Sequence, residues 1–226
     1  MTRDTVPVWD RPERGARGPA PERSRGQITD AAIAVADEEG LQAVSMRRVA
    51  ALLGTGSASL YRYVSGRDDL VDLMVDALTG RIERPAPTGD WAADLVRLAR
   101  AVKALHLRHR WLLDLPPDPA RLGPNALDHL EYALALLAPA PAGDRTKLEV
   151  IGVTTALAVQ FAREEDTATR APARHAAQAA YLARAATDGT RPRLAAALAD
   201  QTPHPHDDRT TLFDHVLHRT ITALIA

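Results

Sequence analysis

The sequence predicts an all-α protein. Apolar residues recur at spacings of three and four along most of the chain, and almost no stretch alternates with the period of two that is typical of a strand. Alanine is abundant and aromatic residues make up only 4%, which also favours helices. Hydrophobic content of 46% and charged content of 25% are ordinary for a globular protein of 226 residues, and this length suits one or two domains. We expect an N-terminal three-helix unit followed by a C-terminal helical bundle.

Residues 1–22 are rich in Arg, Pro and Gly, and we expect them to be disordered when the protein is free. A basic arm of this kind can enter a DNA minor groove, and a plain flexible tail is the alternative. The segment has no apolar core, so it is not expected to be a secretory signal.

Three short helices are predicted next. Ser24 and Gln27 fit a capping box at the start of the first helix, and Gly40 ends it. Ser45 can cap the second helix, whose apolar stripe begins at Met46, and Gly54 follows the stripe at once. A third helix is predicted over residues 57–64.

Two helices joined by a Gly-containing turn are typical of a helix-turn-helix, whose second helix enters the DNA major groove. Leu60 and Val64 would face inward, and aromatic hydroxyls with Arg62 would face outward toward phosphates or base edges. The alternative is that Tyr61 and Tyr63 are half-buried packing residues, and that Arg47 and Arg48 form a solvated face.

A long helix is predicted over residues 65–84, where Ser65 and Asp68 fit a second capping box. Asp68 and Asp69 in its first turn suit the helix dipole. Acidic residues 37–39 lie at the unfavourable end of their helix, and the sequence gives no reason for them.

Residues 23–82 resemble the N-terminal domain of the TetR family of transcriptional regulators. The residues that match the family motif are Leu60, Tyr61, Tyr63, Val64, Arg67 and Leu70. Residues 111–137 also resemble one of the family's C-terminal ligand-binding domains. The resemblance implies a helix-turn-helix DNA-binding domain over 23–84, including the linking fourth helix, and a ligand-binding and dimerisation domain over 90–226.

The resemblance also implies DNA contacts at particular positions. Ser45 and Arg47 would touch a phosphate and a base edge, and Arg67 would bind a phosphate. The recognition helix would present Ser57, Ala58, Ser59, Tyr61 and Tyr63 to the groove, phosphates or thymine methyl groups. Two positions depart from the family. Relatives often have His at position 63. At position 56 the side chain often helps to select the operator sequence in relatives, and Gly56 has no side chain to do so.

Charge and cysteine content fit this interpretation. The net charge is −1, but the first 67 residues carry ten arginines against eight acidic residues, a net charge of +2. The absence of cysteine excludes disulfides and Cys-ligated zinc and is consistent with a cytoplasmic protein. No apolar run approaches the ~20 residues of a membrane span, and we expect no membrane partner.

Six more helices are expected beyond the Pro-rich break at 85–89. Their ranges are 91–109, 125–137, 146–165, 173–187, 191–200 and 212–225. The helix over 146–165 is apolar on most sides. We expect it to pair with the last helix across a two-fold axis as a four-helix dimer interface, which the resemblance supports.

An effector pocket in such a bundle would be mostly apolar with a few polar anchors. The sequence suggests as lining residues Trp91, His106, Trp111, Asn125, His129 and Phe161. His204 and His206 could bind a metal, but a polar loop explains them as well. No catalytic motif is present, and we expect neither an enzyme nor a metal or cofactor, only an unidentified small-molecule effector.

The functional hypothesis is a ligand-responsive, homodimeric repressor that binds a palindromic double-stranded DNA operator in the cytoplasm. A ligand in the C-terminal bundle would favour another tilt of the helix over 65–84 and so release the DNA. An activator or co-repressor-dependent regulator on the same fold is one alternative. A helical small-molecule-binding protein that has lost its DNA function is another.

Overall fold

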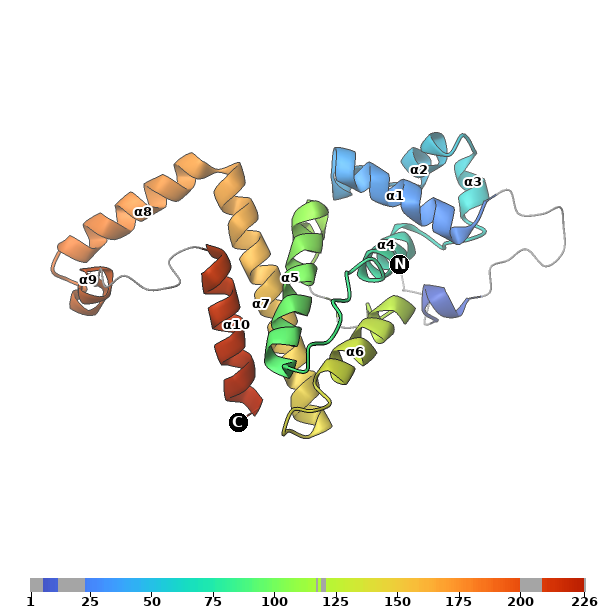
Figure 1. Ribbon diagram of the computed structural model, residues 1–226. Coiled ribbons are helices and arrows are strands. Elements are labelled where there is room, and N and C mark those ends of the chain that lie inside the picture. Colours follow the sequence, from blue (N-terminus) through green and yellow to red (C-terminus); the bar gives the residue numbers. More distant parts are fainter. Residues whose placement is uncertain (1–5, 12–22, 117, 119–120, 200–208, 226) are drawn as a thin grey trace.

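The computed structural model describes residues 6–11, 23–116, 118, 121–199 and 209–225, and this part of the chain is all-α, as predicted (Figure 1). The 3-10 helices are η1 (Val8–Asp10), η2 (Leu41–Ala43) and η3 (Arg110–Asp114). The α-helices are α1 (Arg25–Glu39), α2 (Met46–Leu52), α3 (Ser57–Leu60), α4 (Arg67–Thr79), α5 (Trp91–Arg108), α6 (Pro124–Leu136), α7 (Asp144–Arg170), α8 (Pro172–Thr187), α9 (Pro192–Ala199) and α10 (Arg209–Ile225).

Helices α1 to α4 form the N-terminal unit. The predicted capping box is confirmed, because the Ser24 side chain accepts from the Gln27 backbone N–H and the Gln27 side chain accepts from the Ser24 backbone N–H. Ser45 caps α2 by accepting from the backbone N–H of Arg48 at 3.2 Å. The inward faces meet in a core that includes the fully buried residues Ile28, Val49, Leu60, Leu70 and Met74.

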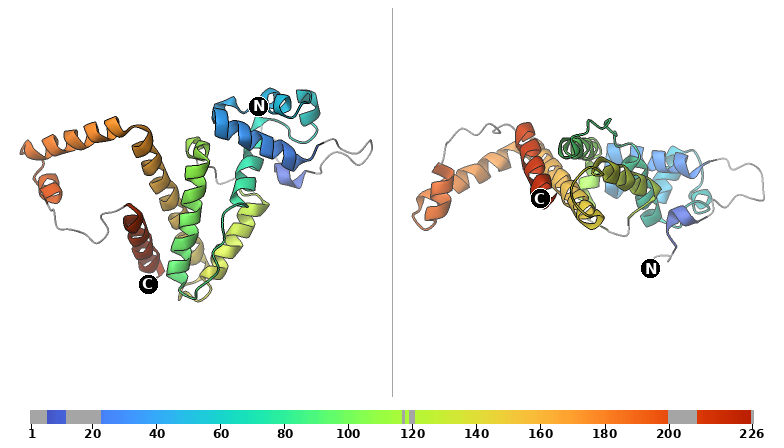
Figure 2. Two further views of the ribbon diagram at one scale, coloured as in Figure 1. Left: turned by 45° about the horizontal axis from the view of Figure 1, so that its top comes forward. Right: turned by 60° about the horizontal axis from the view of Figure 1, so that its bottom comes forward.

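Helices α5, α7 and α10 lie side by side and form the centre of the C-terminal part, while α6 lies between α7 and α4 (Figures 1 and 2). Phe213 of α10 is 1% exposed and packs edge-on against Phe161 of α7, with ring centroids 5.2 Å apart. The Nζ atom of Lys103 on α5 lies 5.0 Å from the Phe213 ring. Aromatic packing and a cation–π contact therefore join the three helices.

Several predicted boundaries were wrong. The third helix ends at Leu60 instead of residue 64, and α4 runs from Arg67 to Thr79 instead of over 65–84. The proposed Ser65–Asp68 capping box is absent; the Ser65 backbone N–H instead donates to Oδ2 of Asp69 at 2.8 Å. Helix α7 reaches 27 residues, which is longer than expected.

Residues 6–11 were expected to be disordered, but they pack on the N-terminal unit. Val8 of η1 is 3% exposed and belongs to the common core. The Arg11 guanidinium donates to Oγ of Ser65 at 2.5 Å and to Oδ2 of Asp69 at 2.6 Å. This ion pair joins the segment to the start of α4, so burial and charge together fix it there.

Helices α8 and α9 extend away from the bundle, connected to it at the end of α7 (Figures 1 and 2). Of the side chains of α8, only that of Ala186 is buried. No helix within the described ranges is long and apolar enough to cross a membrane.

Candidate functional site

The surface around α2 and α3 presents most of the side chains that the sequence suggested for DNA contact. Arg47 and Ala58 are exposed, and the Tyr61 side chain is 55% exposed directly after α3. Ser57 and Ser59 are half-buried on the same short helix. The structure therefore brings a guanidinium, a phenol and two small hydroxyl side chains to one corner of the molecule.

The turn between α2 and α3 depends on one glycine. Gly54 has a φ of 66°, in the left-handed region that favours glycine. Gly56 is the N-cap of α3 and has an ordinary extended conformation with a φ of −80°. The Ser59 hydroxyl donates to the Gly56 carbonyl at 2.7 Å, which holds the start of α3 against the turn.

Two predicted contact residues lie deeper than expected. The Tyr63 side chain is only 7% exposed, so its outward placement was wrong, because the chain leaves the helix at Leu60 and turns residue 63 toward the core. The Arg67 guanidinium donates to the carbonyls of Val44 at 2.9 Å and Leu41 at 2.8 Å. Arg67 thus joins α4 to the segment that precedes α2, and its contact with a phosphate stays a prediction.

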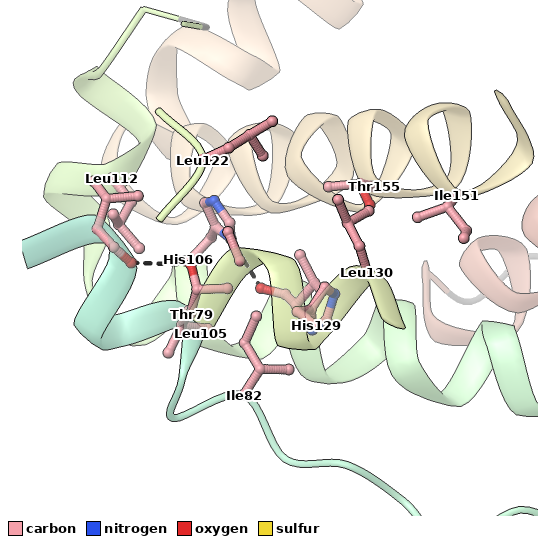
Figure 3. A pocket seen from close by; sticks show the side chains of 13 residues that line it. Thr79, Ile82, Leu105, His106, Leu112, Leu122, His129, Leu130, Ile151 and Thr155 are labelled. Atoms are coloured by element: carbon pink, nitrogen blue, oxygen red, sulfur yellow. Dashed lines mark hydrogen bonds between the residues drawn. The ribbon is translucent and has the colours of Figure 1, made fainter. Parts of the chain in front are cut away.

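A cavity of about 210 Å³ lies between α4, α5, α6 and α7 (Figure 3). Most of its lining is apolar, and α4 contributes to it alongside the helices of the C-terminal part. The lining residues are Val75, Thr79, Ile82, Val102, Leu105, His106, Leu112, Leu122, Ala126, His129, Leu130, Ile151 and Thr155.

Of the six residues that the sequence suggested for an effector pocket, His106 and His129 line this cavity. The other four do not line this cavity, and each has another place. Trp91 is half-buried at the start of α5, Phe161 packs on Phe213, Trp111 donates to Asp37, and Asn125 donates to Asp76.

Sequence reasoning missed the contribution of α4 to the cavity. Val75 and Thr79 are four positions apart on one face of α4, and Ile82 follows three positions later, just beyond the end of the helix; this spacing is the signal that could have found them. Their stripe reads equally well as core packing, and only the position of α6 opposite α4 makes it a cavity wall.

Burial lowers the pKa of both cavity histidines. His106 is desolvated and lies near Arg163, and His129 is desolvated and lies near Arg84. The ring Nδ1 of His106 lies 2.9 Å from the Val102 carbonyl oxygen. Both rings are therefore neutral at neutral pH.

A carboxylate of α4 caps the start of α6. Gly123, the N-cap of α6, provides no side-chain cap, and Asp76 of α4 takes that role. Its Oδ1 accepts from the Ala126 backbone N–H at 3.1 Å, and its Oδ2 accepts from the Asn125 side-chain amide at 2.9 Å. An anion at a helix N-terminus is favourable, so this carboxylate joins α4 to α6.

A second carboxylate joins α1 to the corner between α5 and η3. Oδ1 of Asp37 lies 2.8 Å from Nδ1 of His109 and accepts from Nε1 of Trp111 at 2.9 Å. Glu39, two residues on, pairs with Arg48 of α2 at 2.5 Å. These contacts explain acidic residues at the end of α1 that the sequence left without a reason.

Within the described residues, no group of three His, Asp or Glu side chains is arranged to hold a metal ion. His204 and His206, considered for a metal from the sequence, lie outside the described residues.

Two family models match the chain. "Bacterial regulatory proteins, tetR family" matches residues 28–74, and "Tetracyclin repressor-like, C-terminal domain" matches residues 84–225. The second match alone spans more than half of the chain.

Curated relatives and solved structures agree with these matches. The HTH-type transcriptional repressor DrrR1 of Streptomyces coeruleorubidus is 42% identical over 160 residues, which cover 70% of this chain and 59% of that relative's length. An HTH-type transcriptional regulator of Saccharopolyspora erythraea is 33% identical, covering 74% of this chain and 75% of its own. The structure of Streptomyces coelicolor ActR in complex with actinorhodin has a TM-score of 0.76 and 29% identity, covering 91% of this chain and 96% of ActR.

Proposed function

Because the chain belongs to the TetR family of transcriptional regulators, as its sequence predicted, we propose that it is a repressor released from its operator by a small molecule. The observation that carries the proposal is the position of α4. Its N-terminal Arg67 is bonded to the segment before the DNA-reading helices, and its Val75 and Thr79 line the cavity. One helix thus touches both sites, and a ligand in the cavity acts on it directly.

The relatives support both parts of the proposal. DrrR1 is named a transcriptional repressor, and ActR is a TetR family protein that has been solved with a bound small molecule. We assign the DNA-binding role to Ser45, Arg47, Gly56, Ser57, Ala58, Ser59, Tyr61, Tyr63 and Arg67, with Tyr63 and Arg67 also holding the fold. His106 and His129 keep their proposed effector role, since both line the cavity.

We also propose that two copies pair through α7 and α10. Leu148 and Val153 of α7 and Leu212 and Leu224 of α10 are 40–48% exposed in the single chain, as expected for side chains that a second copy covers. A two-fold dimer matches a palindromic operator with half-sites about 34 Å apart, or a multiple of that distance. The proposed domains are residues 23–84 and 90–226, and the proposed place of action is the cytoplasm.

The proposed mechanism is a population shift. The ligand-free dimer holds its two α3 helices at the operator spacing, and a ligand favours another tilt of α4 through the cavity wall and the Asp76 contact with α6. The coupling free energy between an effector site and a second binding site is typically about 1–3 kcal/mol, so the ligand lowers operator affinity by about five- to 150-fold.

The test is binding of the full chain to the intergenic DNA beside its own gene, at about 50 and 200 mM salt. Tight, salt-sensitive binding that survives excess random DNA supports the proposal. Equal, weak binding to both DNAs contradicts it. An effector that strengthens binding would instead indicate a co-repressor-dependent regulator.

A further inference from the structure

The cavity offers a ligand very few polar atoms. None of its thirteen lining residues is Asp, Glu, Lys or Arg, and the Thr79 hydroxyl already donates to the Val75 carbonyl at 2.9 Å. The rings of His106 on α5 and His129 on α6 lie among the apolar side chains (Figure 3). Besides the Thr155 hydroxyl, the two imidazoles are therefore the lining groups that can recognise a polar group of a ligand.

The protonation of His106 is fixed by its neighbour. A carbonyl oxygen only accepts hydrogen bonds, so the Nδ1 atom that lies 2.9 Å from the Val102 oxygen carries the proton. Since burial keeps the ring neutral, Nε2 holds a lone pair and accepts a hydrogen bond. His106 is thus built to receive a donor from the ligand.

His129 also lines the cavity, and one of its ring nitrogens is unpaired. Its side chain is 9% exposed, and its Nδ1 atom is buried without a hydrogen-bond partner among the described residues. Buried polar atoms are normally paired, because an unpaired one loses its hydration without compensation. Because this atom has almost no accessible surface, a bound molecule would reach it only after the His129 ring turned toward the cavity.

The surrounding charge selects against cations. Arg84 lies close enough to His129, and Arg163 to His106, that each positive charge lowers the pKa of its neighbouring ring. With no carboxylate in the lining, an ammonium group would be desolvated without a counter-charge.

We propose that the effector is an uncharged, largely apolar molecule whose hydroxyl group donates to Nε2 of His106. This inference rests on the proposed function, because it names the ligand class of the same cavity. An apolar cavity of roughly 150 Å³ holds one benzene ring, so a cavity of about 210 Å³ suits a fused two-ring core.

The test uses three probes of equal ring size on the full chain: 2-naphthol, 2-methylnaphthalene and 2-naphthylmethylamine, compared by calorimetric titration. We expect 2-naphthol to bind about five- to tenfold more tightly than the methyl analogue, the gain of one hydrogen bond. We expect no measurable binding of the ammonium probe. Failure of 2-naphthol to bind, or equal binding of all three probes, overturns the ligand class.

Matched variants identify the acceptor. His106→Leu should remove the preference for 2-naphthol over 2-methylnaphthalene, and His106→Gln, which keeps an acceptor oxygen near the position of Nε2, should retain part of it. His175→Leu makes the same change at an exposed histidine of α8, outside the cavity lining, and should leave the preference intact. A preference unchanged in both His106 variants overturns the assignment of His106, and thermal unfolding of each variant confirms that it folds.

Operator binding, measured on the same samples, separates this inference from the proposed function. Intact operator binding with the wrong probe order contradicts only the ligand class. If the unmodified chain does not bind operator but binds the three probes with the expected order of affinities, only the repressor function is contradicted.

Discussion

The carboxylate of Asp76 fills the space that a side chain at residue 123 would need. A Cβ atom on Gly123 would lie 2.4 Å from both Cγ and Oδ1 of Asp76, closer than real Cβ contacts come. Asp76 is 7% exposed and belongs to α4, whose other end adjoins α2 and α3, the corner that we propose to read DNA. The absence of a side chain at 123 is therefore what allows α4 to cap α6.

Gly123→Ala should displace Asp76 from the start of α6. We expect the free energy of unfolding to fall by about 1–3 kcal/mol, from overpacking and from loss of the capping bonds. Urea denaturation at one fixed protein concentration measures it. Gly143→Ala is the matched control, since Gly143 is the N-cap of α7 with no atom within 4 Å of the added Cβ. Equal effects at the two glycines would contradict the close packing.

Asp37→Ala should loosen the contact between α1 and the corner of α5 and η3. It leaves the Trp111 N–H, on a side chain only 3% exposed, without its acceptor, so we expect a loss of about 1–3 kcal/mol in unfolding free energy. Asp37→Asn keeps an acceptor oxygen and should lose less. If both variants match the unmodified chain in urea, the contact does not stabilise the fold.

Arg47→Ala and Tyr61→Ala should each lower operator affinity at least about tenfold, because both side chains are exposed on the surface around α2 and α3 that we propose to read DNA. Dimer mass and thermal stability should stay unchanged. Fluorescence anisotropy with labelled operator measures the affinity. Tyr63→Ala serves as the contrast: this buried side chain should cost stability as well as affinity. Unchanged operator affinity in both exposed variants would contradict the assignment of this surface to DNA binding.

Arg11→Ala should destabilise the start of α4. The Arg11–Asp69 pair has side chains only 20% and 16% exposed, and hydrogen bonds to charged groups of this kind contribute about 1–3 kcal/mol. Arg145→Ala breaks a pair whose side chains are 94% and 62% exposed, and should change stability by less than about 0.5 kcal/mol. Chemical denaturation compares the two; a similar small loss in both would mean that residues 6–11 do not support α4.

Asp94 predicts an acid-sensitive step. Burial alone would raise its pKa, but hydrogen bonds from Thr88, Arg97 and Gly89 outweigh burial and lower the pKa to about 2. Because the folded pKa is below the unfolded value, the stabilisation is complete above about pH 4 and is lost as the pH falls toward 2. The difference corresponds to about 2 kcal/mol.

Unfolding free energies measured between about pH 5 and 2.5 test this expectation. Asp94→Asn should flatten the fall in stability, whereas Asp128→Asn, a change at an exposed carboxylate, should not. An unchanged slope in the Asp94 variant would show that other carboxylates govern the acid response.

Most local features of the fold were readable from the sequence, although the predicted Ser65–Asp68 capping box is absent, and distant partners were not readable. The caps at Ser24 and Ser45 were predictable because each is completed within three residues along the chain. The length of α3 was not predictable, because the helix ends after four residues and the chain then turns the Tyr63 side chain into the core. Tertiary packing overrides local propensity at such positions.

The same distinction holds for the candidate site. The exposed residues Arg47 and Tyr61 follow from the family motif and the periodicity of two helices. The cavity does not, because its wall joins Val75 on α4 to Ala126 on α6, fifty-one positions apart. Trp111 and Asn125 were plausible pocket residues from the sequence. In the structure they donate hydrogen bonds to Asp37 and Asp76, which belong to helices distant in the sequence and so could not be predicted as their partners.

Helix α8 buries almost nothing within its own chain, and Tyr181 and Leu182 point apolar surface outward with 54% and 39% exposure. An element that gains so little from its own subunit opens at low cost in isolation. If the second copy also covers this face of α8, its resistance to proteolysis tracks protein concentration: dilute samples should be cut by trypsin after Arg174 or Arg184 before the bundle is attacked. Cleavage within α8 would thereby report assembly of the dimer without any measurement on DNA.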